Sequence, residues 1–243
     1  MTYSSKGIVL SIENFGEADR YIQFLTKDWG VISVLAKSAR KSKRRYVGGL
    51  DLFCHNEIFL RGDPKDRPYL NELSVLNSFP KLRENLDKVL LAGKIAHWIK
   101  KLANTPTPMP AIYSLMGQSL ALIEKEQNIE KLDLLNTVFK LKLLSLIGLK
   151  PRVDTCAKCE SEEDIEGVFD LNSGGILCRL CSPKADFTGA FTLNPTQRNL
   201  VNVADQIKLT CWDDISFSPE LLSSINRLTT QFASFHTQVK LPI

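Results

Sequence analysis

The sequence predicts an α+β multidomain protein in which a small N-terminal β-barrel precedes an α-helical bundle with an inserted four-cysteine ribbon. Residues 1–79 contain five short β-rich segments, separated by polar or Gly/Pro breaks. From residue 80 onward, apolar side chains recur at helical spacing, and two C-x-x-C pairs interrupt that pattern. We therefore expect a barrel over 1–79, a helical domain over 80–150 and 190–243, and a ribbon over 151–189.

The five β-rich segments are short enough to close into one small barrel. They span residues 7–12, 20–26, 30–36, 50–60 and 69–76. A five-stranded barrel of the oligonucleotide-binding (OB) type is the economical arrangement of five such strands. A small sandwich or an SH3-like barrel fits the same pattern.

The second part of the chain is predicted to be helical on both sides of the cysteine pairs. Amphipathic patterns predict helices over 81–102, 111–126, 132–149 and 219–239. Asn194 followed by Pro195 is typical of a helix start, and predicts a short helix to about residue 205. We expect the Leu and Ile stripes of these helices to form the core. In the first helix the stripe consists of Leu82, Leu86, Val89, Leu90, Ile95, Ala96 and Ile99.

The two cysteine pairs have the spacing of a structural zinc site. Cys156 and Cys159 form one pair, Cys178 and Cys181 the other, and 18 residues lie between them. Two such turns facing each other supply four thiolates and leave no open position, which favours one structural zinc ion over a catalytic one. Segments 167–170 and 175–177, around an Asn-Ser-Gly-Gly turn, predict a two-stranded hairpin between the pairs.

Other uses of these cysteines are disulfide bonding or a redox pair. Disulfides require an oxidising compartment, and the N-terminus does not resemble a signal peptide. A redox motif needs only one pair. Cys54 and Cys211 stand apart from the pairs and next to aromatic residues, so we expect both to be buried apolar side chains.

Composition indicates a soluble, intracellular protein, because no segment is long enough to span a membrane. The net charge of +4 is unevenly distributed. Residues 1–80 carry 12 basic and 9 acidic side chains, residues 81–150 carry 11 and 6, and residues 151–243 carry 8 and 12. The excess of positive charge therefore belongs to the first two thirds of the chain.

One basic run dominates this excess. Six of the nine positions 37–45 are Lys or Arg, and no acidic residue occurs between Asp28 and Asp51. Such a density of like charge favours a polyanionic partner, and a phosphate backbone is the obvious candidate. The alternatives are a solvated loop and a site for an anionic membrane surface. In the OB arrangement the run connects the third and fourth strands, where Tyr46 would be available to stack on a base.

The chain contains few signs of catalytic chemistry. The Walker A, G-x-G-x-x-G, G-x-S-x-G and H-E-x-x-H motifs are all absent. The three histidines, His55, His97 and His236, are far apart, and we expect structural roles for them. The acidic run between residues 160 and 166 is predicted to lie in a solvated loop of the ribbon. The sequence therefore indicates a binding protein, not an enzyme.

The order of these features resembles the RecO family of recombination mediators. Gly7-Ile8-Val9-Leu10 with residues 15–19 and 24–30 is similar to the opening of that family. Ala39-Arg40 followed by residues 49–53 resembles its "A-R…G-x-L-x-x-F" segment. Residues 146–151, the first cysteine pair and residues 174–178 are similar to its "L-x-G-x-x-P…C-x-x-C" and "G-G-x-x-C" stretches. The resemblance weakens after Leu209.

The resemblance implies a DNA repair and recombination function without catalysis, in the bacterial cytoplasm and associated with the nucleoid. Members bind single- and double-stranded DNA, anneal complementary strands without ATP, and act with RecR to load RecA onto DNA coated by single-strand binding protein. The expected DNA-binding residues are Lys37, Arg40, Lys41, Lys43, Arg44, Arg45 and Tyr46. Further contacts to DNA, or to the acidic C-terminal tail of single-strand binding protein, are expected from Lys88, Lys94, Lys100 and Lys101.

Two other functions fit the residues themselves. One is an RNA-binding or ribosome-associated zinc protein, which would prefer RNA over DNA in direct competition. The other is an interaction scaffold whose basic loop binds an acidic protein, and which would bind no nucleic acid at low salt.

Overall fold

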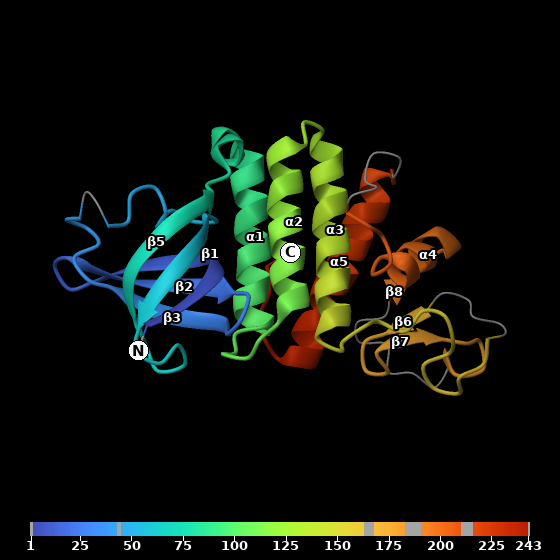
Figure 1. Cartoon of the computed structure of the whole chain (residues 1–243). Coiled ribbons are helices and arrows are strands. Elements are labelled where there is room, and N and C mark those ends of the chain that lie inside the picture. Colours follow the sequence, from blue (N-terminus) through green and yellow to red (C-terminus); the bar gives the residue numbers. More distant parts are fainter. Residues whose placement is uncertain (1, 43–44, 163–167, 183–190, 210–215, 243) are drawn as a thin grey trace. The chain divides into compact units, whose positions relative to one another are not determined.

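The computed structural model describes residues 2–42, 45–162, 168–182, 191–209 and 216–242 (Figure 1). The chain divides into two compact units, Met1–Gln127 and Asn128–Ile243. The first unit contains the strands of the barrel and two long helices. The second contains two further long helices, a short helix and the cysteine ribbon. The three regions proposed from the sequence differ from this division and remain a prediction.

Five strands of the first unit close into a barrel, as predicted. They are β1 (Thr2–Phe15), β2 (Asp19–Thr26), β3 (Gly30–Ala36), β4 (His55–Arg61) and β5 (Tyr69–Asn77). Their order around the barrel is β1-β2-β3-β5-β4. The long β1 pairs with both β2 and β4, and a bulge between Val9 and Ser11 divides the two halves of its pairing with β2. This is the OB arrangement that the number of strands suggested.

Alternating apolar side chains fill the barrel interior. Ile22 and Phe24 of β2, Val34 of β3 and Ile58 of β4 are fully buried in one core cluster. Their sequence neighbours on each strand therefore point outward, because successive side chains of a strand alternate between its two faces.

The loop between the two long helices of the first unit packs closely against the barrel at Gly30. This residue has φ of +70°, and a Cβ there would lie 2.1 Å from the carbonyl oxygen of Thr107. The amide of Val31 donates to the carbonyl of Thr105 at 2.9 Å. Only glycine allows this approach, so Gly30 positions the helices on the barrel.

The fourth strand begins at His55, and the prediction that it starts at residue 50 was wrong. Residues 50–53 form a turn in which Phe53 has φ of 69°. The amide of Phe53 donates to the carbonyl of Val9 at 2.9 Å, which draws this segment against β1. Leu50 and Phe53 are buried although neither lies in a strand, so their apolar character did not distinguish a strand from a packed turn.

The first predicted helix is divided into a 3₁₀ segment, η1 (Pro80–Glu84), and α1 (Leu86–Leu102). Asn85 lies between them in an extended conformation, and its side chain accepts a hydrogen bond from the amide of Lys88 at 3.2 Å. This is an N-cap, which starts a new helix. The next helix, α2 (Pro110–Lys125), agrees with the prediction to within a residue.

The buried face of α1 differs from the predicted stripe. Leu86 and Leu90 were assigned to the core but are 72% and 55% exposed. Ile95, Ala96 and Ile99 are buried as predicted, whereas Leu91 and Trp98 are buried although they were not assigned to the stripe. Because α1 starts anew after the Asn85 cap, its buried face is not the continuation of the stripe predicted from residue 82 onward.

In the second unit, α3 (Ile129–Leu146) packs against α5 (Pro219–Thr237). A small sheet of β6 (Val168–Asp170), β7 (Gly175–Leu177) and β8 (Phe191–Thr192) precedes α4 (Pro195–Val203). Asn194 and Gln197 form a capping box at the start of α4, as the Asn-Pro pair suggested. Among the described residues, no helix is both long and apolar enough to cross a membrane.

Candidate metal centre and nucleic-acid interface

The four cysteines of the two pairs converge on one point. The sulfur atoms of Cys156, Cys159, Cys178 and Cys181 all lie within 4.8 Å of one another. Cys159 Sγ and Cys178 Sγ are 3.7 Å apart. In a tetrahedral site with zinc–sulfur bonds of about 2.3 Å, neighbouring sulfurs lie about 3.8 Å apart. The cluster therefore has the donor set and dimensions of a closed four-sulfur metal site.

Local backbone structure creates this convergence. The amide of Glu160 donates to the carbonyl of Cys156 at 2.9 Å, and that of Ser182 to the carbonyl of Cys178, also at 2.9 Å. Each pair thus folds into a tight turn. The β6–β7 hairpin carries the second pair, and the amide of Ala157 donates to the carbonyl of Ile176 at 2.8 Å, which fixes the first turn against β7.

The electrostatics of the cluster also suit a cation. Burial raises the pKa of the Cys156 thiol, but hydrogen bonds from the amides of Cys178, Cys159 and Lys158 outweigh burial and bring it to about 6. The neighbouring Cys178 sulfur, followed by burial, raises the pKa of Cys181 to about 12. One thiolate is thus favoured by the backbone, whereas crowding with the other sulfurs disfavours further negative charge. A bound cation removes that repulsion.

The basic run follows β3 directly and belongs to the connection between β3 and β4. Lys37, Arg40, Lys41 and Arg45 are all exposed. Lys43 and Arg44 lie outside the described residues. In the described part of the chain, none of those four exposed side chains forms an ion pair, so their charge is available to an anion.

Backbone contacts hold this basic loop against the turn between β1 and β2. The amide of Ser38 donates to Asp19 Oδ1 at 2.7 Å, and the amide of Arg40 donates to the carbonyl of Ala18 at 2.9 Å. Arg45 Nη2 donates to the carbonyl of Lys37 at 3.0 Å. Arg40 Nη1 likewise donates to the carbonyl of Glu17 at 3.2 Å. The guanidinium groups of Arg40 and Arg45 therefore both contact neutral carbonyls. The described residues of the loop are therefore held in place without neutralisation of their positive charge.

Tyr46 does not present its ring for base stacking, and this correction has a clear physical reason. The residue is 5% exposed and belongs to the barrel core. Its hydroxyl donates to the carbonyl of Leu70 at 3.0 Å. Burial raises the pKa of the phenol, which keeps it protonated as a donor. Tyr46 thus anchors the end of the basic loop to β5.

The four lysines proposed on the first long helix differ in accessibility. Lys88 is 5% exposed, and its Nζ donates to the carbonyl of Glu124 on α2 at 2.9 Å, so it is not available to DNA or a partner. Lys94 and Lys101 are exposed, and Lys100 is partly exposed. The sequence reasoning grouped Lys88 with the other three, because nothing in the sequence indicated that this lysine would bridge two helices.

His55 connects the barrel to α2. Its Nε2 lies 2.5 Å from the hydroxyl of Tyr113, and the two rings meet edge to face. Burial raises the pKa of Tyr113 to about 12, with a contribution from Asp28, so the phenol is the donor. Burial, together with Lys6, lowers the pKa of His55, which favours the neutral imidazole as acceptor. This interaction is structural.

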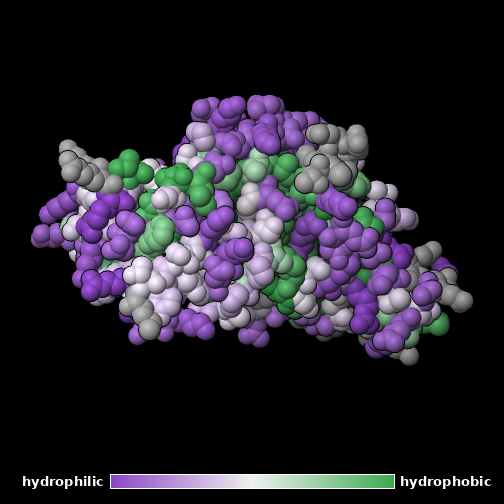
Figure 2. Space-filling model, viewed as in Figure 1, coloured by the Kyte–Doolittle hydropathy of each residue, from purple (hydrophilic) through white to green (hydrophobic). Residues whose placement is uncertain are grey.

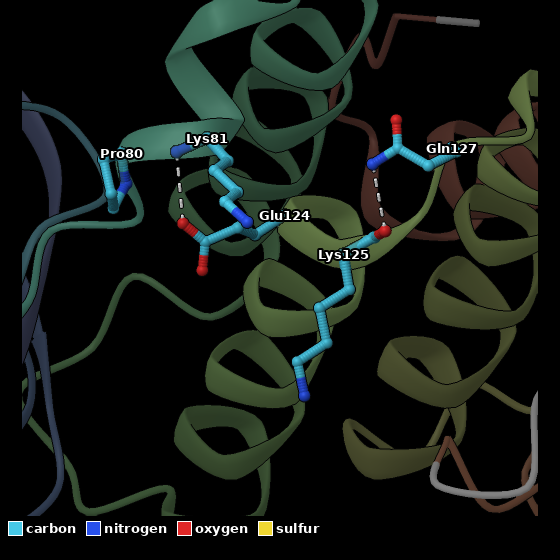
Figure 3. A pocket seen from close by; sticks show the side chains of 5 residues that line it. All are labelled: Pro80, Lys81, Glu124, Lys125 and Gln127. Carbon is cyan, nitrogen blue, oxygen red and sulfur yellow. Dashed lines mark hydrogen bonds between the residues drawn. The ribbon is translucent and has the colours of Figure 1, made fainter.

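A hollow of about 400 Å³ lies beside the start of η1 and the end of α2 (Figure 3). It is lined by Pro80, Lys81, Glu124, Lys125 and Gln127. The amide of Lys81 donates to Glu124 Oε1 at 3.2 Å. Charges of both signs line the hollow, and Gln127 Nε2 donates to the carbonyl of Lys125 at 3.2 Å, so the lining does not define one kind of ligand.

Two exposed aromatic residues beside the basic loop were not selected from the sequence. Phe15 ends β1 and is 49% exposed, and Tyr69 begins β5 and is 43% exposed. The Nζ of Lys37 lies 4.3 Å from the centroid of the Tyr69 ring. Strand alternation was the available signal, because Tyr69 precedes the buried Leu70 and must therefore point outward.

Fold and site together define an OB-barrel protein with a basic loop, a helical region and a four-cysteine ribbon capable of binding metal. Comparison with protein families agrees with this class. Residues 1–79 match the N-terminal model of recombination protein O, and residues 83–242 match its C-terminal model. The chain therefore belongs to the RecO family of DNA repair proteins, whose members are recombination mediators.

Individual relatives support the same assignment. The DNA repair protein RecO of Rubrobacter xylanophilus is 35% identical over 185 residues, which are 75% of this chain and 73% of the relative. RecO of Acetivibrio thermocellus is 28% identical over 229 residues, or 94% and 89% of the two chains. RecO of Alkaliphilus metalliredigens is 25% identical over 237 residues, or 97% and 94%.

Proposed function

We propose that this protein binds single- and double-stranded DNA and anneals complementary strands without ATP. The observation that carries the proposal is the basic loop of the barrel, whose described cations are exposed and form no ion pairs within the described residues. Backbone and side-chain contacts hold Ser38, Arg40 and Arg45 in place, which supports binding of a phosphate backbone by the described part of the loop. Lys37, Arg40, Lys41 and Arg45 are the proposed phosphate contacts, with Lys43 and Arg44 from the same run.

Charge neutralisation suffices for annealing. Two single strands repel each other through their phosphates, and a protein that neutralises both lowers the barrier to their encounter. Base pairing then supplies the free energy. This mechanism requires no general acid, general base or nucleotide, and we accordingly propose that the protein is not an enzyme.

The four-cysteine cluster is proposed to hold one structural zinc ion. All four ligand positions come from cysteine, and a shell of this kind has no position for water or substrate. The zinc would hold the two C-x-x-C turns together and stabilise the ribbon. Among the described residues, the apolar cluster around the thiols consists of Cys156, Leu177 and Cys178, with Ala157 and Cys181 packed against it. Three of these five residues are themselves proposed ligands, so a metal crosslink would contribute much of what holds the two turns together.

Partners are proposed from family membership and from surface charge. RecR is the proposed partner in loading RecA onto DNA coated by single-strand binding protein. The acidic tail of the latter is proposed to contact the exposed Lys94, Lys100 and Lys101. We further propose that the protein acts in the bacterial cytoplasm, at the nucleoid.

Annealing of two labelled complementary oligonucleotides, without nucleotide or magnesium, tests the function. We expect the wild-type protein to accelerate annealing above the spontaneous rate, with the acceleration lost as salt rises. A protein that binds DNA but does not accelerate annealing would contradict the strand-pairing function. Preference for RNA in direct competition, or no binding to any nucleic acid at low salt, would contradict the DNA-binding function as well.

The salt dependence of binding tests the loop itself. Removing two phosphate contacts with Lys41→Ala and Arg45→Ala should reduce the slope of log K against log salt by about 1.8 on duplex DNA. The charge-retaining pair Lys41→Arg and Arg45→Lys should keep the slope. Lys125→Ala removes an exposed charge at the end of α2 and is the control for net charge alone. An unchanged slope in the double alanine variant would show that these side chains do not contact phosphate.

A further inference from the structure

We propose that the outer face of the barrel carries a stacking platform for unpaired bases, formed by Phe15, Tyr21 and Tyr69. This inference rests on the proposed DNA-binding function and deepens it. The basic loop would hold phosphates of any nucleic acid, whereas these aromatic side chains would select single strands.

Strand register places the platform in one row across four strands. Tyr21 on β2 lies opposite Glu13 on β1 and opposite Leu35 on β3. Leu35 in turn lies opposite Tyr69 on β5. Because Ile22, Val34 and Leu70 enter the barrel core, their neighbours Tyr21, Leu35 and Tyr69 point to the outer face.

Phe15 extends the row at the β1 end. Its ring packs on that of Tyr21, with centroids 4.8 Å apart and an interplanar angle of 60°. Phe15 pairs with Asp19, two residues from Tyr21, and the two aromatic side chains therefore share one face of the β1–β2 hairpin. The pair holds Phe15 in place although about half of it faces solvent.

The row has a length suited to several nucleotides. Tyr21 and Tyr69 are separated by two strand spacings, or about 10 Å. Successive bases of one DNA strand rise by about 3.4 Å when stacked as in B-form. The rings at the two ends are thus far enough apart to stack on different bases of one strand.

The basic loop lies beside both Tyr69 and the β1–β2 turn that follows Phe15, where the amide of Arg40 donates to the carbonyl of Ala18 at 2.9 Å. It follows β3 directly, and Lys37 reaches over the Tyr69 ring with its Nζ 4.3 Å from the centroid. A phosphate near Lys37 would therefore lie next to a base on Tyr69. The surroundings of Phe15 are of mixed charge, because the exposed Glu13 and Glu17 lie near it in the chain and Arg40 contacts the carbonyl of Glu17. An uncharged base face suits these surroundings better than a phosphate does.

Exposure alone would not support this inference, since isolated apolar residues are common on protein surfaces. Figure 2 shows hydrophobic side chains at several places on a largely hydrophilic surface. Phe15 and Tyr69 differ from an isolated exposed residue because Tyr69 shares a register row with Tyr21, Phe15 packs on Tyr21, and a cation lies beside Tyr69. Base–aromatic stacking with an adjacent positive groove is the usual means of binding single strands without sequence preference.

The proposed platform should affect the affinity for single-stranded DNA but not the affinity for duplex DNA. Bases of a duplex are already stacked and paired, and cannot reach a ring on the barrel surface. Alanine substitution of a stacking aromatic residue weakens single-strand binding by about 5- to 150-fold per base. Duplex binding should be unchanged, because its phosphate contacts remain.

Fluorescence anisotropy with a labelled single strand and with its duplex, at one low salt concentration, provides the test. We expect Phe15→Ala and Tyr69→Ala each to weaken single-strand binding at least 5-fold, while duplex affinity and both salt slopes stay at wild-type values. Phe15→Tyr and Tyr69→Phe should keep single-strand affinity, because the ring is retained. Phe235→Ala is the matched control, since Phe235 is 48% exposed on α5.

Three results would overturn the platform. Unchanged single-strand affinity in both alanine variants would show that no base stacks there. An equal loss on single strands and duplex would assign the rings to phosphate binding or to folding. A similar loss of single-strand affinity in Phe235→Ala would show that the effect is not specific to Phe15 and Tyr69. If the wild-type protein binds neither ligand, the proposed DNA-binding function fails together with the platform, whereas normal wild-type binding with unaffected variants overturns the platform alone.

Discussion

Tyr46 offers the sharpest test of the difference between a DNA-contacting residue and a core residue. Its ring is 5% exposed, and its hydroxyl donates to the carbonyl of Leu70 at 3.0 Å. Tyr46→Phe removes this hydrogen bond and leaves a buried carbonyl without its donor, which costs about 1–3 kcal/mol of unfolding free energy. Tyr46→Ala also removes the packed ring, and large-to-small changes of this kind cost about 3–5 kcal/mol.

These losses should appear in stability and not in DNA affinity. For a chain of this size, 1 kcal/mol lowers the melting temperature by about 2–4 °C, so Tyr46→Phe is expected to lower it by at least that amount. Urea unfolding followed by circular dichroism measures the free energy, and anisotropy below the melting temperature measures single-strand affinity. The order of stability should be wild type, then Tyr46→Phe, then Tyr46→Ala, with affinities of the folded proteins within about twofold, well inside the range that a lost base stack covers.

A stacking role for Tyr46 predicts the opposite pattern. In that case Tyr46→Phe would behave as wild type in both measurements, because the ring that stacks is retained. Tyr46→Ala would keep wild-type stability and lose single-strand affinity. That combination would refute the core assignment. Tyr46→Phe also covers the possibility that the alanine variant does not fold, because its smaller change leaves the core filled.

Three further predictions concern the metal site, the barrel–helix contact and the helix lysines. Cys178→Ser should lower the zinc content well below one ion per chain and lower the melting temperature; full zinc occupancy measured by mass spectrometry would contradict a four-sulfur site. Because burial lowers the pKa of His55, the unfolded state binds more protons below pH 6.5, so stability is unaffected by this group above that pH and falls as pH drops towards the folded-state pKa. Urea unfolding at pH 7.5 and 5.5 should show a smaller fall for His55→Gln than for wild type; an equal fall would assign the pH dependence elsewhere. Lys88→Ala should destabilise the protein by about 1–3 kcal/mol through loss of its bond to Glu124, whereas the exposed Lys94→Ala should leave the unfolding free energy within about 0.5 kcal/mol of wild type. Equal effects on stability would mean that the buried bond contributes nothing.

Local sequence patterns were sufficient where the structure depends on neighbours along the chain. The cysteine spacing predicted a converging four-sulfur cluster because each C-x-x-C turn is closed by its own backbone hydrogen bonds. Asn194 and Pro195 predicted the start of α4 because a cap acts within one turn of helix. The second, third and fifth strands agree with prediction to within a residue, since their Gly and polar breaks lie at the strand ends.

Errors occurred where a distant segment decides the conformation or the environment. Residues 50–53 are apolar enough for a strand but form a turn, because the Phe53 amide donates to the carbonyl of Val9 on β1. Lys88 is a charged residue of the kind that usually lies on an exposed helix face, but α2 buries it. The bonding partner is far away in the sequence in both cases. Glu124 lies 36 residues from Lys88, and Val9 lies 44 residues from Phe53.

The sequence by itself determined the element types, the cysteine cluster, the location of the basic loop and the resemblance that identified the family. These follow from short-range periodicity, turn chemistry and charge density, which are properties of neighbouring residues. Only the tertiary structure decided that Tyr46 belongs to the core, that Tyr21 and Tyr69 share one register row, and that Phe15 packs on Tyr21. Such assignments depend on strand register, because pairing between strands determines which outward side chains of distant segments become neighbours.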